Sequence, residues 1–82
     1  MASTVIKRSV KLDGRKTSVS LEDEFWEALK EIAPVRGMPL RGLIVSIDRT
    51  RNQDNLSSAL RLFVLEFYRD QAERRGSDRA AA

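Results

Sequence analysis

Apolar and polar residues alternate over two short segments near the N-terminus. Val10 and Leu12 flank a lysine in the first segment, and residues 17–21 alternate in the same way. A period of two residues places successive side chains on opposite faces of a strand, and the intervening Asp13-Gly14 is a strong signal for a two-residue hairpin turn. We therefore predict a strand at 15–21 and a further strand at 8–12. The alternative left open is that residues 7–12 form a flexible basic arm.

From about residue 22 onward the apolar residues recur at helical spacing. Gly37 suits the left-handed residue that ends a helix, and Pro39 suits the first turn of the next one. Asn55 or Ser57 could cap a third helix. These signals predict three helices, at about residues 22–36, 39–51 and 56–75. They define a single domain over residues 7–75, with residues 1–6 and 76–82 expected to be disordered tails.

The third helix carries apolar residues over an unusually wide part of its surface. Leu60, Phe63 and Phe67 form one stripe, but Leu62 and Leu65 lie outside it, and a helix on a monomer surface needs a narrower stripe. A chain of 82 residues buries only roughly 60–65% of the surface exposed by its unfolded form. A second copy of the chain is the expected cover. The residues expected in the dimer core are Val19, Leu21, Phe25, Leu29, Leu60, Phe63 and Phe67.

The composition argues against catalysis. The chain has neither cysteine nor histidine, which removes thiol chemistry, imidazole acid-base catalysis and the usual zinc ligands. The acidic residues Glu22, Asp23 and Glu24 are explained by the positive end of a helix dipole. We therefore expect no enzyme activity, no cofactor and no metal. No apolar run approaches the roughly 20 residues that cross a bilayer, so a cytoplasmic protein without a membrane partner is expected.

The charges are sorted along the chain, although the net charge is only +3. Residues 1–20 contain five Lys or Arg residues and one acidic residue, Asp13. A basic strand in front of two amphipathic helices could pair with its copy in a twofold dimer, and such a two-stranded ribbon fits the major groove of DNA. On this strand Lys16, Ser18 and Ser20 point outward together. They are the expected contacts to base edges.

Three segments together resemble the ribbon-helix-helix (MetJ/Arc-like) family of DNA-binding proteins, in particular small stand-alone bacterial members. They are the segments Thr17–Phe25, Arg36–Leu40 and Leu56–Leu65. The resemblance implies a mainly α-helical, intertwined homodimer with a short intersubunit β-ribbon in the major groove of double-stranded DNA. It maps base reading onto Lys16, Ser18 and Ser20.

The resemblance also implies phosphate contacts at a helix start. These fall on the amides of Leu40 and Arg41, and Arg15 and Lys11 are also expected to bind phosphate. The alternative site is Ser57 and Ser58 at the start of the third helix. Two features depart from the family pattern. The two serines are shorter than the readers that are common in the family, and the chain has three helices where the minimal fold has two.

Two functions are compatible with these features. The first is a transcriptional regulator that binds DNA with full or partial sequence specificity. The second is an antitoxin-like module that grips a protein partner with its last helix and tail. Antitoxins of this family tend to carry a longer disordered extension than the residues that follow Arg75 here, which favours the first function.

Overall fold

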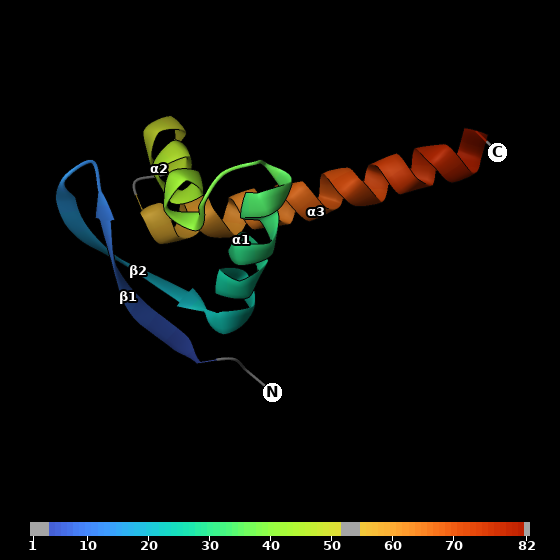
Figure 1. Cartoon of the computed structure of the whole chain (residues 1–82). Helices are drawn as coiled ribbons and strands as arrows, with labels where there is room; N and C mark the ends of the chain where they lie inside the picture. The colour runs from blue at the N-terminus through green and yellow to red at the C-terminus, as the bar shows by residue number, and fades with distance from the viewer. Residues whose placement is uncertain (1–3, 52–54, 82) are drawn as a thin grey trace.

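The computed structural model describes residues 4–51 and 55–81. The chain forms two strands followed by three helices (Figure 1): β1 (Val5–Leu12), β2 (Arg15–Glu22), α1 (Asp23–Val35), α2 (Leu40–Thr50) and α3 (Leu56–Ala81). The predicted fold class, mainly helical with a short β-ribbon, is therefore confirmed. The two shorter helices begin one residue later and end one residue earlier than predicted.

The two strands form an antiparallel hairpin within one chain. Its register pairs Leu12 with Arg15 at the turn and Val5 with Glu22 at the open end. Asp13 and Gly14 both have positive φ, 52° and 81°, as a type I′ turn requires. The alternative of a flexible basic arm at 7–12 is therefore wrong. One edge of β2 is therefore paired with β1 of the same chain, and its expected pairing with a second copy stays a prediction.

The first helix begins and ends at residues that the sequence marks. Glu22, the last residue of β2, is its N-cap residue, and Asp23 and Glu24 lie in its first turn. At the other end Gly37 has a φ of 70°. The N–H of Met38 donates to the carbonyl oxygen of Ala33 at 3.0 Å, and the N–H of Gly37 donates to that of Pro34 at 2.9 Å. This is a Schellman motif, in which a left-handed glycine ends the helix.

One hydrophobic core lies between the inner face of the hairpin and the three helices. In Figure 1 the hairpin lies to one side of the helices; β1 contacts α2, while β2 contacts α1 and α3. The fully buried side chains come from every element: Leu12, Val19, Leu21, Leu29, Ile32, Leu43, Ile44 and Leu60. The hairpin therefore has one face packed on the core and one facing outward.

The last helix is longer than predicted. It runs to Ala81 rather than to about residue 75, and Figure 1 shows its C-terminal part projecting beyond the packed body. Asp70 and Arg74 form an ion pair of 3.1 Å at helical spacing there, which supports an exposed helix. Of the predicted tails, residues 1–3 and 82 lie outside the described residues. None of the described helices is both long and apolar enough to span a membrane.

Candidate nucleic-acid interface

The outward face of the hairpin is made of lysine and serine alone along most of its length. Three cross-strand pairs build it: Lys7 opposite Ser20, Ser9 opposite Ser18, and Lys11 opposite Lys16. We call these six residues the ribbon face. Five of the six are exposed and Ser20 is half-buried. The structure thus brings together the three predicted base-reading residues, Lys16, Ser18 and Ser20, and adds three residues of β1 beside them.

Two lysines of the ribbon face are held side by side. Lys11 and Lys16 are directly opposite on neighbouring strands, an arrangement that is destabilising for like charges. Among the residues that the structure describes, neither lysine forms an ion pair, and the same is true of Lys7. The ribbon face therefore carries a positive charge that the described part of the chain does not neutralise.

The start of α3 binds the outer edge of β2. The N–H of Ser20 donates to the hydroxyl oxygen of Ser57 at 2.9 Å, and the Arg61 guanidinium donates to the carbonyl oxygen of Ser20 at 2.9 Å. Arg61 also donates to the Glu22 carboxylate at 3.1 Å. A hydrogen bond from the backbone amide of Glu22 and the bond from Arg61 both favour the ionised carboxylate, so the pKa of Glu22 lies below its usual range.

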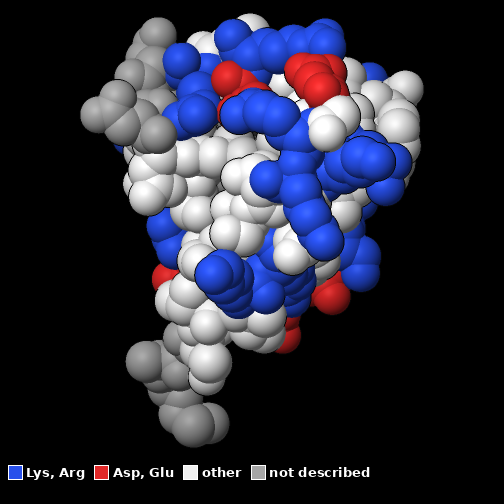
Figure 2. Space-filling model, turned by 90° about the vertical axis from the view of Figure 1, so that its left-hand side faces the viewer, with Lys and Arg blue, Asp and Glu red and all other residues white. Residues whose placement is uncertain are grey.

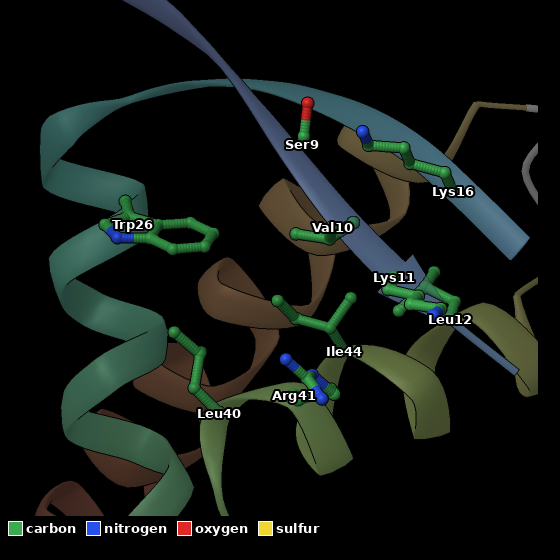
Figure 3. A pocket seen from close by; sticks show the side chains of 9 residues that line it. All are labelled: Ser9, Val10, Lys11, Leu12, Lys16, Trp26, Leu40, Arg41 and Ile44. Carbon is green, nitrogen blue, oxygen red and sulfur yellow. The ribbon is translucent and has the colours of Figure 1, made fainter. Parts of the chain in front are cut away.

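The start of α2 lies beside the other strand. Leu40 and Arg41 of α2, Val10 and Lys11 of β1 and Trp26 of α1 line part of an open hollow of about 680 Å³. Figure 3 shows Trp26 of α1 and Leu40 of α2 pointing toward Val10 of β1, with Ser9 and Lys16 on the other side of that strand. The predicted phosphate-binding residues Leu40 and Arg41 therefore lie next to the ribbon face.

The two helix starts differ in how their amides are satisfied. In α2 the N-cap residue is Pro39, which makes no side-chain cap, and the first turn has no acidic residue. In α3 the side-chain oxygen of Asn55 accepts the N–H of Ser58 at 3.2 Å, and the Ser57 hydroxyl is bonded to β2. Because a helix start with open amides is the better place for an anion, the geometry favours Leu40 and Arg41 over Ser57 and Ser58.

The turn of the hairpin is fixed to α2 by ion pairs. Arg49 donates to both carboxylate oxygens of Asp13, at 2.7 and 3.3 Å. Arg15 pairs with Asp48 at 3.2 Å, and Arg51 pairs with the same carboxylate at 3.0 Å. Arg15, expected to contact phosphate, is thus engaged within the chain, although most of its side chain is exposed. These contacts hold the tip of the ribbon in place.

The open end of the hairpin is held by a contact that the sequence did not reveal. The Arg8 guanidinium lies over the Trp26 ring, 4.5 Å from its centre, and donates to Asp23 at 2.6 Å. Arg8 lies on the inward face of β1, opposite Val19. The sequence signal for this contact is an arginine at an apolar position of a strand, with an acidic and an aromatic residue at the start of the helix that follows the hairpin.

Lys and Arg side chains gather over the side of the molecule that carries the hairpin and α2. Figure 2 shows this face, with basic side chains spread around a central uncharged area and acidic ones confined to small patches. Arg41 of α2, which lines the same hollow as Lys11 and Lys16, forms no ion pair with a described residue. The positive field therefore extends from the ribbon face to the start of α2.

The residues expected in a dimer core fall into two groups. Val19, Leu21, Leu29 and Leu60 are fully buried within one chain. The half-buried residues Phe25, Phe63 and Phe67 pack against that core, and Arg36 lies over the rings of Phe63 and Phe67, 5.3 and 5.8 Å from their centres. Exposed apolar side chains remain on α3, where Leu62, Leu65 and Tyr68 are 40%, 47% and 41% exposed.

Comparison with known proteins matches this arrangement to a family. The ribbon-helix-helix domain matches residues 5–68, which include both strands, α1, α2 and the first half of α3. The chain belongs to the ribbon-helix-helix family.

This ribbon-helix-helix chain is similar to a protein of solved structure, an uncharacterized protein from Bordetella pertussis Tohama I. The two chains are 38% identical in sequence, and their structures superpose with a TM-score of 0.73. The match covers 89% of the present chain and 62% of that protein. The ribbon-helix-helix chain thus spans less than two thirds of the length of this relative. Among curated proteins, none matches the chain.

Proposed function

We propose that this ribbon-helix-helix protein binds double-stranded DNA through the ribbon face and acts as a transcriptional regulator rather than as an enzyme. One observation carries the proposal. The outward face of a two-stranded ribbon presents only lysine and serine over three successive cross-strand pairs. Lysines attract phosphates and can reach guanine oxygens, while serine hydroxyls donate to or accept from base edges.

The surroundings of the ribbon face support the same function. The open amides at the start of α2, with Arg41 next to them, are suited to a phosphate beside the groove. Short serine readers make few discriminating contacts, so we expect phosphate contacts to supply most of the affinity. Binding should then weaken steeply with salt, because each neutralised phosphate contributes about −0.9 to the slope of log K against log salt concentration.

The test is the affinity of the protein for a labelled random-sequence DNA duplex over a series of salt concentrations. Lys16→Gln should weaken binding and make the salt slope shallower by about one, the loss of one phosphate contact. Lys30→Gln removes the same charge from an exposed position on α1, where Lys30 pairs with Glu27 at 3.2 Å, and should leave the slope unchanged. Equal losses in both variants, or no binding by the parent protein, would contradict the proposal.

We also propose that the protein acts as a homodimer. The exposed apolar side chains Leu62, Leu65 and Tyr68 on α3 are the surface that a second copy would cover. The same surface favours a second candidate function, in which α3 binds a different protein as an antitoxin would. Expression of the protein together with its genomic neighbours distinguishes the DNA-binding function from the antitoxin-like function. A small protein that stays with the chain in stoichiometric amount during purification would support the second function.

A further inference from the structure

The open hollow between β1, α1 and α2 combines an apolar lining with positive charge. Its volume is about 680 Å³, within the range of roughly 300–1,000 Å³ that is usual for small-molecule sites. We propose that it binds a small organic acid with an apolar body, and that this ligand competes with DNA. The binding site stands on its own observations, whereas the competition rests on the proposed function.

Apolar side chains from three elements line most of the hollow. Leu12 and Ile44 are buried, and Val10, Trp26 and Leu40 are half-buried. The last three point toward one another from β1, α1 and α2 (Figure 3). A DNA phosphate has no apolar surface and would leave these side chains in contact with water. An apolar ligand would remove them from water, which is favourable.

The charged residues that the structure describes around the hollow are all basic: Lys11, Lys16 and Arg41. They are exposed, and none of them forms an ion pair with a described residue. A ligand that ends in a carboxylate can therefore pair with a cation while its apolar part contacts Trp26 and Leu40. A cationic ligand of the same shape would be repelled.

The hollow lies apart from the surfaces expected to meet a second copy. The exposed apolar residues proposed for the homodimer are on α3, whereas the described residues that line the hollow belong to the hairpin, α1 and α2. Pairing of β2 with a second copy would use the edge of β2 that faces away from β1. The hollow is lined by β1 over four successive residues, 9–12. A small ligand is therefore the occupant that fits its size and charge.

Arg41 and Lys11 connect this site to DNA binding. Both are proposed to contact DNA phosphates, and a carboxylate paired with either of them would neutralise the same charge. Ligand and duplex would then weaken each other's binding by the same factor. The protein would leave DNA when the acid is abundant.

Decanoate and decanol are suitable probes because they have the same alkyl chain and differ in charge. Trp26 is the only tryptophan of the chain, so its fluorescence reports binding at the hollow without a label. Decanoate, kept below its critical micelle concentration, should bind at least about tenfold more tightly than decanol, as expected for one charge-assisted hydrogen bond. Equal or tighter binding of decanol would overturn the site, because it would indicate an unspecific apolar surface.

Two variants separate the charge from the apolar contact. Arg41→Gln should weaken decanoate binding at least about fivefold and change decanol binding less than about twofold. Leu40→Gln places a polar amide in the apolar lining and should weaken the binding of both probes. Lys30→Gln, on α1 and paired with Glu27, is the matched control and should change neither. An Arg41→Gln variant that binds decanoate as tightly as the parent does would overturn the site.

Competition is measured with the labelled duplex at constant ionic strength. Decanoate should raise the dissociation constant for DNA in proportion to its occupancy of the hollow, and decanol at the same concentration should not. Bound decanoate without any change in DNA affinity would overturn the competition. If the parent binds no duplex, the proposed function and the competition both fail, and the fluorescence titration still decides the binding site.

Discussion

The hydroxyl oxygen of Ser57 accepts the backbone N–H of Ser20 at 2.9 Å, which joins the first turn of α3 to the outer edge of β2. The two residues lie far apart in the chain, and the bond is partly buried. A strand edge that would otherwise be open to another chain is therefore occupied near its C-terminal end. The position of the hairpin on the helices depends on contacts of this kind as well as on the core.

Removal of the Ser57 hydroxyl should destabilise the fold. Ser57→Ala leaves the Ser20 N–H without its partner, and we expect a loss of about 0.5–1.5 kcal/mol in the free energy of unfolding. Ser58→Ala is the matched control, since the neighbouring hydroxyl has no such bond to β2. Urea denaturation measures both. Equal stability of the two variants would show that solvent replaces the Ser57 bond at no cost.

The ion pair between Glu22 and Arg61 should make stability depend on acid. Because the pKa of Glu22 is lowered in the folded chain, its contribution is present above the unfolded pKa of about 4.3 and is lost as the pH falls through the lower folded value. Glu22→Gln should therefore be less stable than the parent at pH 7, and the difference should shrink toward pH 3. Glu66→Gln, at an exposed position on α3, controls for the loss of one carboxylate. A difference that stays constant from pH 7 to pH 3 would exclude this linkage.

Two glycines should respond to alanine in opposite ways. Gly14 has a φ of 81° and nothing within 4 Å of an added Cβ, so Gly14→Ala should destabilise the hairpin by about 1 kcal/mol through backbone strain alone. In Gly42, inside α2, an added Cβ would meet Pro39 at 3.5 Å, an ordinary contact. Gly42→Ala should stabilise the helix by about 0.5–1 kcal/mol. Thermal unfolding of the two variants gives the signs, and a stabilising Gly14→Ala would contradict the turn geometry.

The proposed homodimer should depend on the exposed apolar side chains of α3. Leu65→Gln replaces a side chain that is 47% exposed and should raise the dissociation constant of the dimer, as measured by sedimentation at several concentrations. Val35→Gln makes the same kind of change at a residue of α1 that is 69% exposed. It should have a smaller effect. A monomeric parent protein at micromolar concentration would rule out the dimer.

Local signals were sufficient to predict most of the fold. Asp13-Gly14 predicts the hairpin because both residues tolerate a positive φ, and Gly37 predicts the end of α1 for the same reason. The two-residue turn also fixes the register, which sets Ser9 opposite Ser18. The pairing of β2 with a second copy is implied by the family resemblance and stays a prediction.

The contacts to base edges were predicted only on one strand, whereas Lys11 of β1 was expected to bind phosphate. The alternation of residues 15–21 identifies Lys16, Ser18 and Ser20 as outward, and the structure places them there. Ion pairs between distant segments could not be predicted, because the spacing of apolar residues does not indicate which charged side chains lie close together. Arg15 with Asp48 and Arg61 with Glu22 are such pairs. They decide which arginines are engaged within the chain before any ligand binds.

The opposite positions of Lys11 and Lys16 have a consequence for the protein without DNA. Like charges directly opposite each other destabilise a strand pair, so a polyanion bound at these two lysines should stabilise the end of the hairpin next to the turn. Folding and ligand capture are then thermodynamically linked at this end of the molecule. The melting temperature should rise in the presence of heparin or duplex DNA. A variant that lacks one of the two lysines should have a higher melting temperature without DNA and a smaller rise when DNA is added.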